Sequence, residues 1–154
     1  MNILTTNAFC VLFAFSCITS SAQTNTHLKD PDYNKPHLFD DMPSKMKLHI
    51  TSLEALLDLP VGARVNTFIG SDFHFVGKVV SKSPSSNTQS KTVVVQSMNR
   101  VGASLTFTKL TQPDGSAKYI GRIVSFKNGD AFEIVKEKDQ YFLLKKNLYE
   151  IIGE

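Results

Sequence analysis

The chain has 154 residues, of which 42% are hydrophobic and 20% are charged, and it carries a formal net charge of +3. Acidic and basic residues are interspersed along the chain, so no concentrated basic face is predicted and nucleic acid is not expected as a partner. A chain of this length buries enough surface to form one hydrophobic core, so a single folded domain is expected.

The first residues, 1–22, are typical of a secretion signal. An apolar run, Ala8 to Ile18, precedes small residues that suit a signal peptidase, which predicts cleavage after Ala22. The run is shorter than the roughly twenty apolar residues that span a bilayer, so no transmembrane segment is expected. We therefore expect a secreted or periplasmic bacterial protein.

Both cysteines, Cys10 and Cys17, lie inside the predicted signal. The mature chain is therefore expected to hold no thiol and no disulfide, and its stability depends on its core. Lipid anchoring at Cys17 is the alternative, but Ala14 and Phe15 do not match the residues that bacterial lipoprotein signals carry there.

Residues 23–45 are polar and interrupted by prolines, a composition that predicts a disordered tail or tether. Within them, the amphipathic cluster Pro36–Pro43 is expected to pack on the domain, with docking on a partner as the alternative. Residues 46–154 are expected to form one β-rich globular domain.

A short helix is predicted at the start of this domain. Thr51 and Glu54 have the T-x-x-E spacing of a capping box, in which each side chain bonds the other's backbone N–H, and leucines on one face follow. Pro60 and Gly62 end the helix.

From Ala63 onward the apolar period falls to 2, which indicates strands. Links rich in Gly, Asn and Asp make neighbouring strands antiparallel, the long polar loop Ser83–Ser90 being the exception, and a closing helical turn is predicted over Leu148–Ile152. The fold class is therefore all-β, a small barrel or a sandwich. About seven strands are predicted: Ala63–Ile69, Phe73–Ser81, Thr92–Met98, Ala103–Leu110, Lys118–Ser125, Ala131–Lys136 and Tyr141–Lys146.

Two predicted strands have similar sequences, because Phe75–Ser81 is repeated with conservative changes as Tyr119–Ser125. This favours an internal duplication of a three-stranded unit. Gly77 and Gly121 lie in mid-strand, where glycine accompanies a bend, a bulge or a close backbone approach, and they suit the corners of a barrel.

No metal or cofactor site is predicted, because the four histidines lack metal-ligand spacing and no phosphate-binding glycine loop occurs. His37 with Asp40 and Asp41 offers a weak cation site, but solvated side chains are the preferred interpretation. The acids of the last strands, Asp130 among them, are also expected to be solvated.

No catalytic residue is predicted either. His74 lies beside Ser71 and Asp72, but neighbours in one strand point to opposite faces and do not form a triad. The lysines of the last hairpin, such as Lys136 and Lys145, are expected to protect an edge strand from aggregation, with steering of an acidic partner as the alternative.

The strand and glycine pattern resembles the β-rich N-terminal propeptides of secreted bacterial zinc metalloendopeptidases. The resemblance covers Leu53–Glu154 and implies a binding module, here free-standing without a protease domain, and it carries over no functional residue. Its segments are Leu59–Gly62, Phe75–Val79, Tyr119–Ile123, Gly129–Ile134 and Tyr141–Leu144.

We therefore expect a non-enzymatic exported module that binds another secreted or envelope protein, as an inhibitor or chaperone of a secreted peptidase. The alternatives are a β-barrel that binds a small ligand or glycan, and a structural protein of the envelope. The sequence assigns no partner-binding residue.

Overall fold

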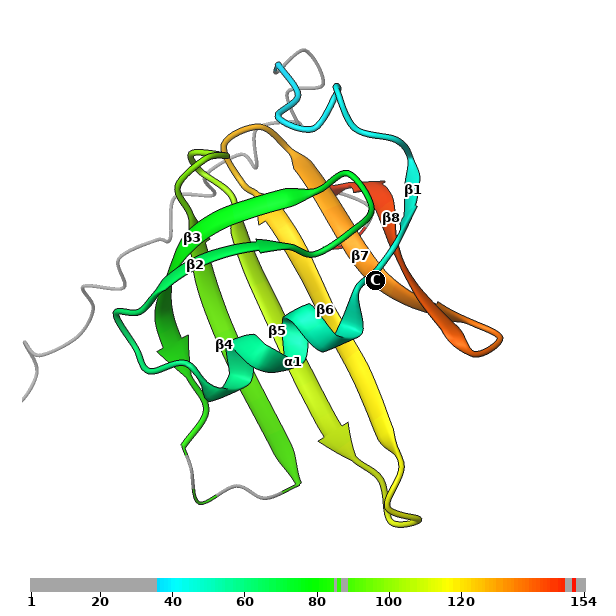
Figure 1. The fold of residues 1–154 in the computed structure, drawn as a ribbon. Helices are drawn as coiled ribbons and strands as arrows, with labels where there is room; N and C mark the ends of the chain where they lie inside the picture. Colours follow the sequence, from blue (N-terminus) through cyan, green and yellow to red (C-terminus); the bar gives the residue numbers. More distant parts are fainter. Residues whose placement is uncertain (1–35, 85, 87–88, 149–150, 152–154) are drawn as a thin grey trace, which may run out of the picture. The chain divides into compact units, whose positions relative to one another are not determined.

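The computed structural model describes residues 36–84, 86, 89–148 and 151. In this part of the chain, eight antiparallel strands form one sheet in the order β1-β8-β7-β6-β5-β4-β3-β2, which curls into a half-barrel beside a short helix (Figure 1). The elements are β1 (Lys45–Lys47), α1 (Ile50–Asp58), β2 (Arg64–Phe68), β3 (His74–Lys82), β4 (Ser90–Ser97), β5 (Ser104–Thr111), β6 (Ala117–Ser125), β7 (Asp130–Glu137) and β8 (Gln140–Asn147).

The predicted all-β antiparallel fold is confirmed, and strands β2 to β8 correspond to the seven predicted ones. The sandwich alternative requires two facing sheets, whereas these strands form a single sheet. Strand β1 was not predicted, because three residues with a lysine on each side of Met46 are too short to show a period. Leu148 and Ile151 are helical, as expected for a closing turn, while the predicted signal lies outside the described residues.

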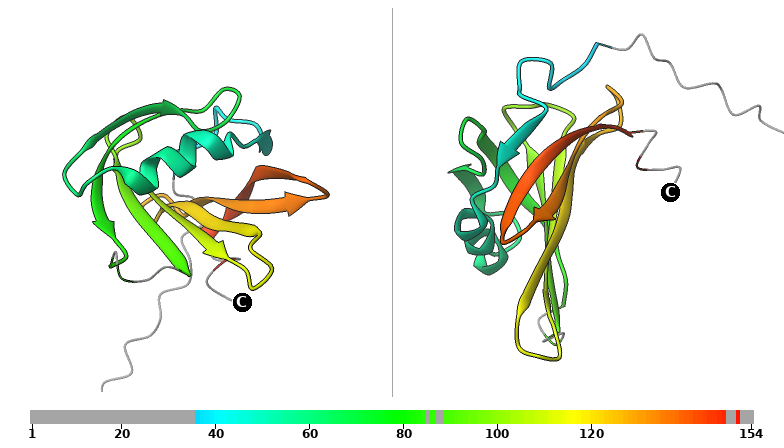
Figure 2. Two further views of the ribbon diagram at one scale, coloured as in Figure 1. Left: turned by 60° about the horizontal axis from the view of Figure 1, so that its bottom comes forward. Right: turned by 90° about the vertical axis from the view of Figure 1, so that its right-hand side faces the viewer.

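The two ends of the sheet approach each other at one point. Leu48, just after β1, forms a bridge with Gly70, and the backbone N–H of His49 donates to the carbonyl oxygen of Ile69 over 2.9 Å. Beyond this bridge α1 packs beside β2 and over β4, so the helix fills the opening that the sheet leaves (Figure 2).

Helix α1 is confirmed, but its predicted capping box is wrong. His49 occupies the N-cap and no side chain caps the helix. The Glu54 carboxylate instead accepts hydrogen bonds from Lys109 Nζ at 2.6 Å and Tyr119 Oη at 2.8 Å. The carboxylate thus pairs with a full positive charge and a hydroxyl donor, and Glu54 turns toward β5 and β6.

Phenylalanine side chains fill the interior of the curled sheet. Phe39, Phe73, Phe75, Phe107 and Phe132 are each at most 1% exposed. Phe39 lies 5.1 Å from Phe132 and 6.2 Å from Phe73 between ring centroids, which is the range of favourable aromatic pairs. The barrel interior is therefore a packed core.

Residues 36–45, which the sequence placed in a polar tail, belong to the folded unit. Phe39 and Met42 are buried, and Lys145 Nζ donates to their carbonyl oxygens over 2.6 and 2.7 Å. The cluster Pro36–Pro43 thus packs on the domain as expected. We call residues 36–43 the N-terminal strap; the domain boundary lies before residue 46.

The mid-strand glycines meet neighbouring backbone, as expected. A Cβ atom at Gly77 would lie 2.6 Å from the carbonyl oxygen of Gln96, and one at Gly121 would overlap that of Thr106. The crowded neighbour is the following strand for Gly77 and the preceding strand for Gly121, so these contacts do not support the three-strand duplication.

Candidate binding surfaces

The histidine and acids of the strap do not converge on one point. His37 Nδ1 is bonded to the carboxylate of Asp130, whereas Asp41 makes a bidentate ion pair with Arg100, with N–O distances of 2.9 and 2.5 Å. Within the described part of the chain, no group of three His, Cys, Asp or Glu side chains has metal-binding geometry.

His74 is likewise engaged outside its sequence neighbourhood. Its Nε2 lies 2.6 Å from Asn66 Oδ1, and its ring lies 4.8 Å from that of Phe68. The hydrogen-bond partner of His74 is therefore an amide on β2, Asn66, which lies eight positions away in the chain.

Asp130 was expected to be solvated, and this is wrong. The residue is 6% exposed, and its carboxylate accepts hydrogen bonds from the backbone N–H groups of Leu38 and Phe39 as well as from His37. No local pattern identifies this role, because the donors lie about ninety positions earlier in the chain.

The predicted role of the last-hairpin lysines, protection of an edge strand, does not apply to β8, which is not an edge strand of the sheet. Strand β8 lies between β1 and β7, and Lys145 holds the strap. Lys136 lies on β7, with its Nζ 5.9 Å from the ring centroid of Tyr141.

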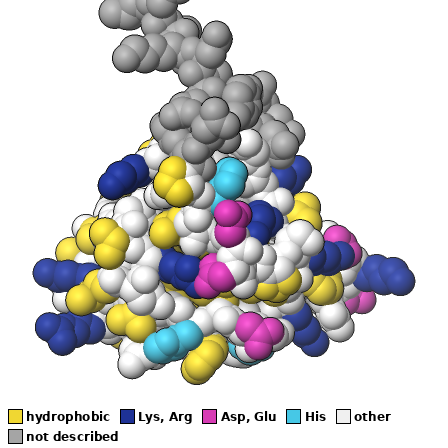
Figure 3. Space-filling view, turned by 90° about the horizontal axis from the view of Figure 1, so that it is seen from above, with side chains coloured by type: hydrophobic (Ala, Val, Ile, Leu, Met, Phe, Trp, Pro, Cys, Tyr) yellow, Lys and Arg dark blue, Asp and Glu magenta, His cyan; other side chains and the backbone are white. Residues whose placement is uncertain are grey.

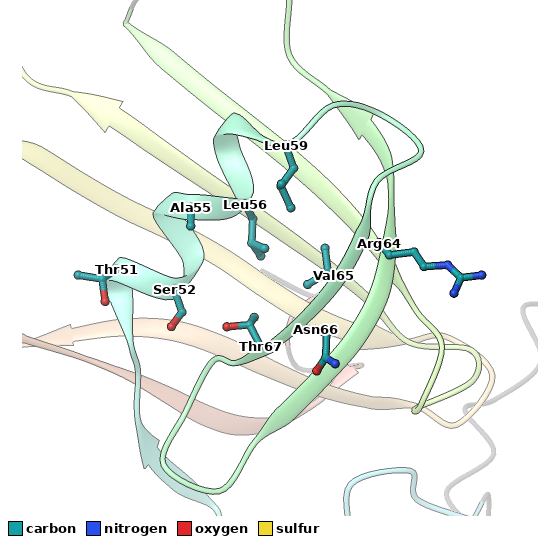
Figure 4. A pocket seen from close by; sticks show the side chains of 9 residues that line it. All are labelled: Thr51, Ser52, Ala55, Leu56, Leu59, Arg64, Val65, Asn66 and Thr67. Atoms are coloured by element: carbon teal, nitrogen blue, oxygen red, sulfur yellow. The ribbon is translucent and has the colours of Figure 1, made fainter.

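One groove, of about 460 Å³, runs between α1 and β2 (Figure 4). Leu56 and Val65 point toward each other at its floor, while Arg64 extends away from it. Ser52, Asn66 and Thr67 add hydroxyl and amide groups. The groove is thus lined by an apolar floor and a neutral polar rim.

A second groove, of about 340 Å³, lies between β6 and the β7–β8 hairpin. The register of β6 with β7 covers only Arg122–Ser125, although β6 begins at Ala117 and is paired with β5 from Ala117 to Val124. The tips of the β5–β6 and β7–β8 hairpins consequently point apart (Figures 1 and 2). We call this the β6 groove; its lining includes Lys118, Tyr119, Ile120, Ile134, Lys136 and Tyr141.

Tyr119, which lines the β6 groove, belongs to a charge-balanced cluster with Glu54 and Lys109. The hydrogen bonds of Glu54 to Lys109 and then Tyr119 lower the pKa of the Glu54 carboxyl. Burial, followed by the hydrogen bond to Glu54, raises the pKa of Tyr119 to about 12. Glu54 is thus an ionised acceptor matched by Lys109, and Tyr119 is a neutral donor at ordinary pH.

The rim of the β6 groove carries unmatched positive charge. Lys118 and Lys136 are exposed and neither belongs to any of the salt bridges among the described residues. On the face seen in Figure 3, by contrast, basic, acidic and apolar side chains alternate.

In comparisons with known proteins, no family model, no curated protein and no solved structure matches the chain. Within the ranges that the structure describes, no helix combines the length and apolar character that crossing a membrane requires.

Proposed function

We propose that this protein is an exported, non-enzymatic module that binds another protein. The observation that carries the proposal is the stretch Ala117–Gly121 of β6, which is paired with β5 on one side but has no partner in the register with β7 on the other. This free edge faces a groove. A strand edge of this kind offers main-chain hydrogen bonds to an incoming polypeptide. The packed phenylalanine core supports surface recognition over ligand binding inside the barrel.

The proposed partner class is a secreted peptidase, with the protein acting as its inhibitor or chaperone. Support comes from the resemblance to peptidase propeptides, whose segments fall largely on the curled sheet, in β3, β6, β7 and β8. Such a partner would share the compartment that the predicted signal specifies.

The test uses the full-length protein, titrated into secreted zinc metalloendopeptidases purified from the same organism while peptide hydrolysis is followed. Stoichiometric inhibition, or faster recovery of active peptidase after refolding, is the expected result. The proposal is overturned if no peptidase is affected and the immobilised protein retains no partner from envelope or culture-supernatant fractions.

A second candidate function is binding of a small polar ligand or glycan in the α1–β2 groove. The hydroxyl groups of Ser52 and Thr67 around an apolar floor favour it. Calorimetric titration with oligosaccharides tests this alternative, and Thr67→Val is expected to abolish any heat of binding that belongs to the groove.

A further inference from the structure

We infer that the β6 groove receives an acidic, extended segment of a partner protein as an additional β-strand. The inference rests on the proposed function and specifies its site and the chemistry of the partner. Three features carry it: the free edge of β6, the direction of its backbone donors, and the charge at the rim.

The free edge of β6 is longer and more open than the outer edges of β1 and β2, the two end strands of the sheet. Strand β1 has three residues and a lysine at each end, and short charged edges resist pairing. The edge of β2 has α1 beside it, which is another natural form of protection. The stretch Ala117–Gly121 of β6 is longer than β1, carries a single lysine, Lys118, and faces a groove rather than the helix.

Backbone donors of β6 point into the groove at alternate residues. The Tyr119 N–H donates to Tyr141 Oη over 3.3 Å, which is longer than an ordinary N–H···O bond. Because donor directions alternate along a strand, the N–H groups of Ala117 and Gly121 point the same way, while those of Lys118 and Ile120 point toward β5. The Tyr141 hydroxyl is thus a weak acceptor that stands where the carbonyl oxygen of a neighbouring strand would otherwise accept this bond.

The walls of the groove suit the side chains of an added strand. Ile120 is 41% exposed although it is a large apolar residue, and Tyr119 and Tyr141 pack edge to face with ring centroids 5.3 Å apart. Apolar and aromatic walls contact alternate residues of a bound strand, while its main chain pairs with the edge.

Charge at the rim selects the occupant. Lys118 and Lys136 are exposed cations without a salt bridge, and the nearby Glu54 is already bonded by Lys109 at 2.6 Å. Acidic side chains on the incoming segment would therefore be attracted. A second copy of the chain is disfavoured as the occupant, because pairing the β6 edges of two copies would bring their groove lysines, Lys118 and Lys136, close to one another.

The first experiment titrates the full-length protein with the synthetic peptide acetyl-Glu-Val-Asp-Trp-Glu-Val-amide. The protein contains no tryptophan, so the indole fluorescence of the peptide reports binding directly. A control peptide with lysine in place of each acidic residue is expected to bind about tenfold more weakly or not at all.

Charge reversal assigns the site. The double variant Lys118→Glu/Lys136→Glu is expected to weaken binding of the acidic peptide about tenfold or more and to gain affinity for the lysine peptide. The matched control Lys78→Glu/Lys127→Glu makes the same change in net charge at two exposed lysines outside the groove lining, and it is expected to change affinity less than about twofold.

Strand addition also predicts an alternating pattern of amide protection. On peptide binding, hydrogen exchange should slow at Ala117, Tyr119 and Gly121 and stay unchanged at Lys118 and Ile120, whose amides already face β5. Ala117→Pro, which removes one groove-facing donor at a strand edge that tolerates proline, should weaken the peptide while leaving the thermal transition in place.

The outcomes separate the two proposals. If the protein binds a peptidase with equal affinity before and after Lys118→Glu/Lys136→Glu, and no alternating protection develops, the β6 assignment is wrong and the proposed function stands. If the peptide does not bind, no peptidase is affected and no envelope or culture-supernatant protein is retained, both are wrong. A dimer that dissociates in the double variant would assign the groove to a second copy and overturn the acidic partner.

Discussion

Glu54 shows how one side chain can serve a role that its local sequence does not indicate. Its spacing from Thr51 predicts a helix cap, yet its carboxylate bonds Lys109 on β5 and Tyr119 on β6. These bonds tie α1 to the β5–β6 hairpin at the wall of the β6 groove. Because they favour the ionised carboxylate, the pKa of Glu54 is lowered from its ordinary value of 4.5.

This lowered pKa gives a prediction for the dependence of stability on pH. At acid pH the unfolded chain binds a proton at Glu54 that the folded chain does not, so the contribution is complete above pH 4.5 and is lost as the pH falls through the lowered folded-state pKa. Asp41, bonded by Arg100, shares this direction.

We expect Glu54→Gln to reduce the loss of unfolding free energy on acidification, measured by urea titration from about pH 6 to about pH 3. Glu133→Gln, at a half-buried carboxylate on β7 without a salt bridge among the described residues, is the control. This role would be contradicted if the free energy of unfolding fell as steeply on acidification in Glu54→Gln as in the unchanged protein.

At the scale of elements, the N-terminal strap is held by polar contacts from the far end of the chain. Asp130, at the start of β7, accepts the N–H groups of Leu38 and Phe39, and Lys145 on β8 donates to the carbonyl oxygens of Phe39 and Met42. The backbone of the strap, which makes a turn at Phe39–Met42, is therefore held by side chains of β7 and β8, and Phe39 reaches the core.

Removing the acceptor should loosen the strap. Asp130→Ala leaves two backbone N–H groups without their acceptor. A buried donor without an acceptor lowers the free energy of unfolding by about 1–3 kcal/mol. We expect that loss in chemical denaturation, together with faster amide exchange at Phe39, while Asp130→Asn, which keeps one oxygen, should lose less. Asp139→Ala, in the exposed β7–β8 turn, should leave both measurements unchanged.

At the scale of the whole molecule, the strap, the helix and the sheet share one core. The same buried cluster includes Phe39 from the strap, Leu53 from α1, Phe107 from β5 and Leu143 from β8. A half-barrel has an open side, and here α1 and the strap supply apolar side chains that a closed barrel would take from further strands. Its parts should therefore unfold together.

A matched pair of phenylalanine variants checks this shared core. Phe39→Ala is expected to lower the free energy of unfolding by about 3–5 kcal/mol, and its transitions by circular dichroism and tyrosine fluorescence should coincide. Phe126→Ala, at a side chain that is 64% exposed, should change stability by less than about 0.5 kcal/mol. Separate transitions in the Phe39→Ala protein would show that the strap unfolds independently.

Local chemistry determined most of the secondary structure. A period of 2 in apolar residues reflects the alternation of side chains in any strand, so β2 to β8 could be predicted to within a residue or two. Gly102, Gly115 and Gly129 have positive φ values of 95°, 82° and 71°, as their predicted turns require. Helix α1 ends before Pro60 because proline cannot continue it.

What only the tertiary structure decided depends on partners far apart in the chain. The burial of Asp130 requires the strap, the role of Glu54 requires β5 and β6, and β1 exists because β8 pairs with it. The β6 groove forms because β6 and β7 share register only at Arg122–Ser125, beside Gly121, where the backbone of β5 leaves no room for a Cβ atom. Sequence patterns report contacts between near neighbours, whereas the divergence of two hairpins follows from how the whole sheet curls around its core.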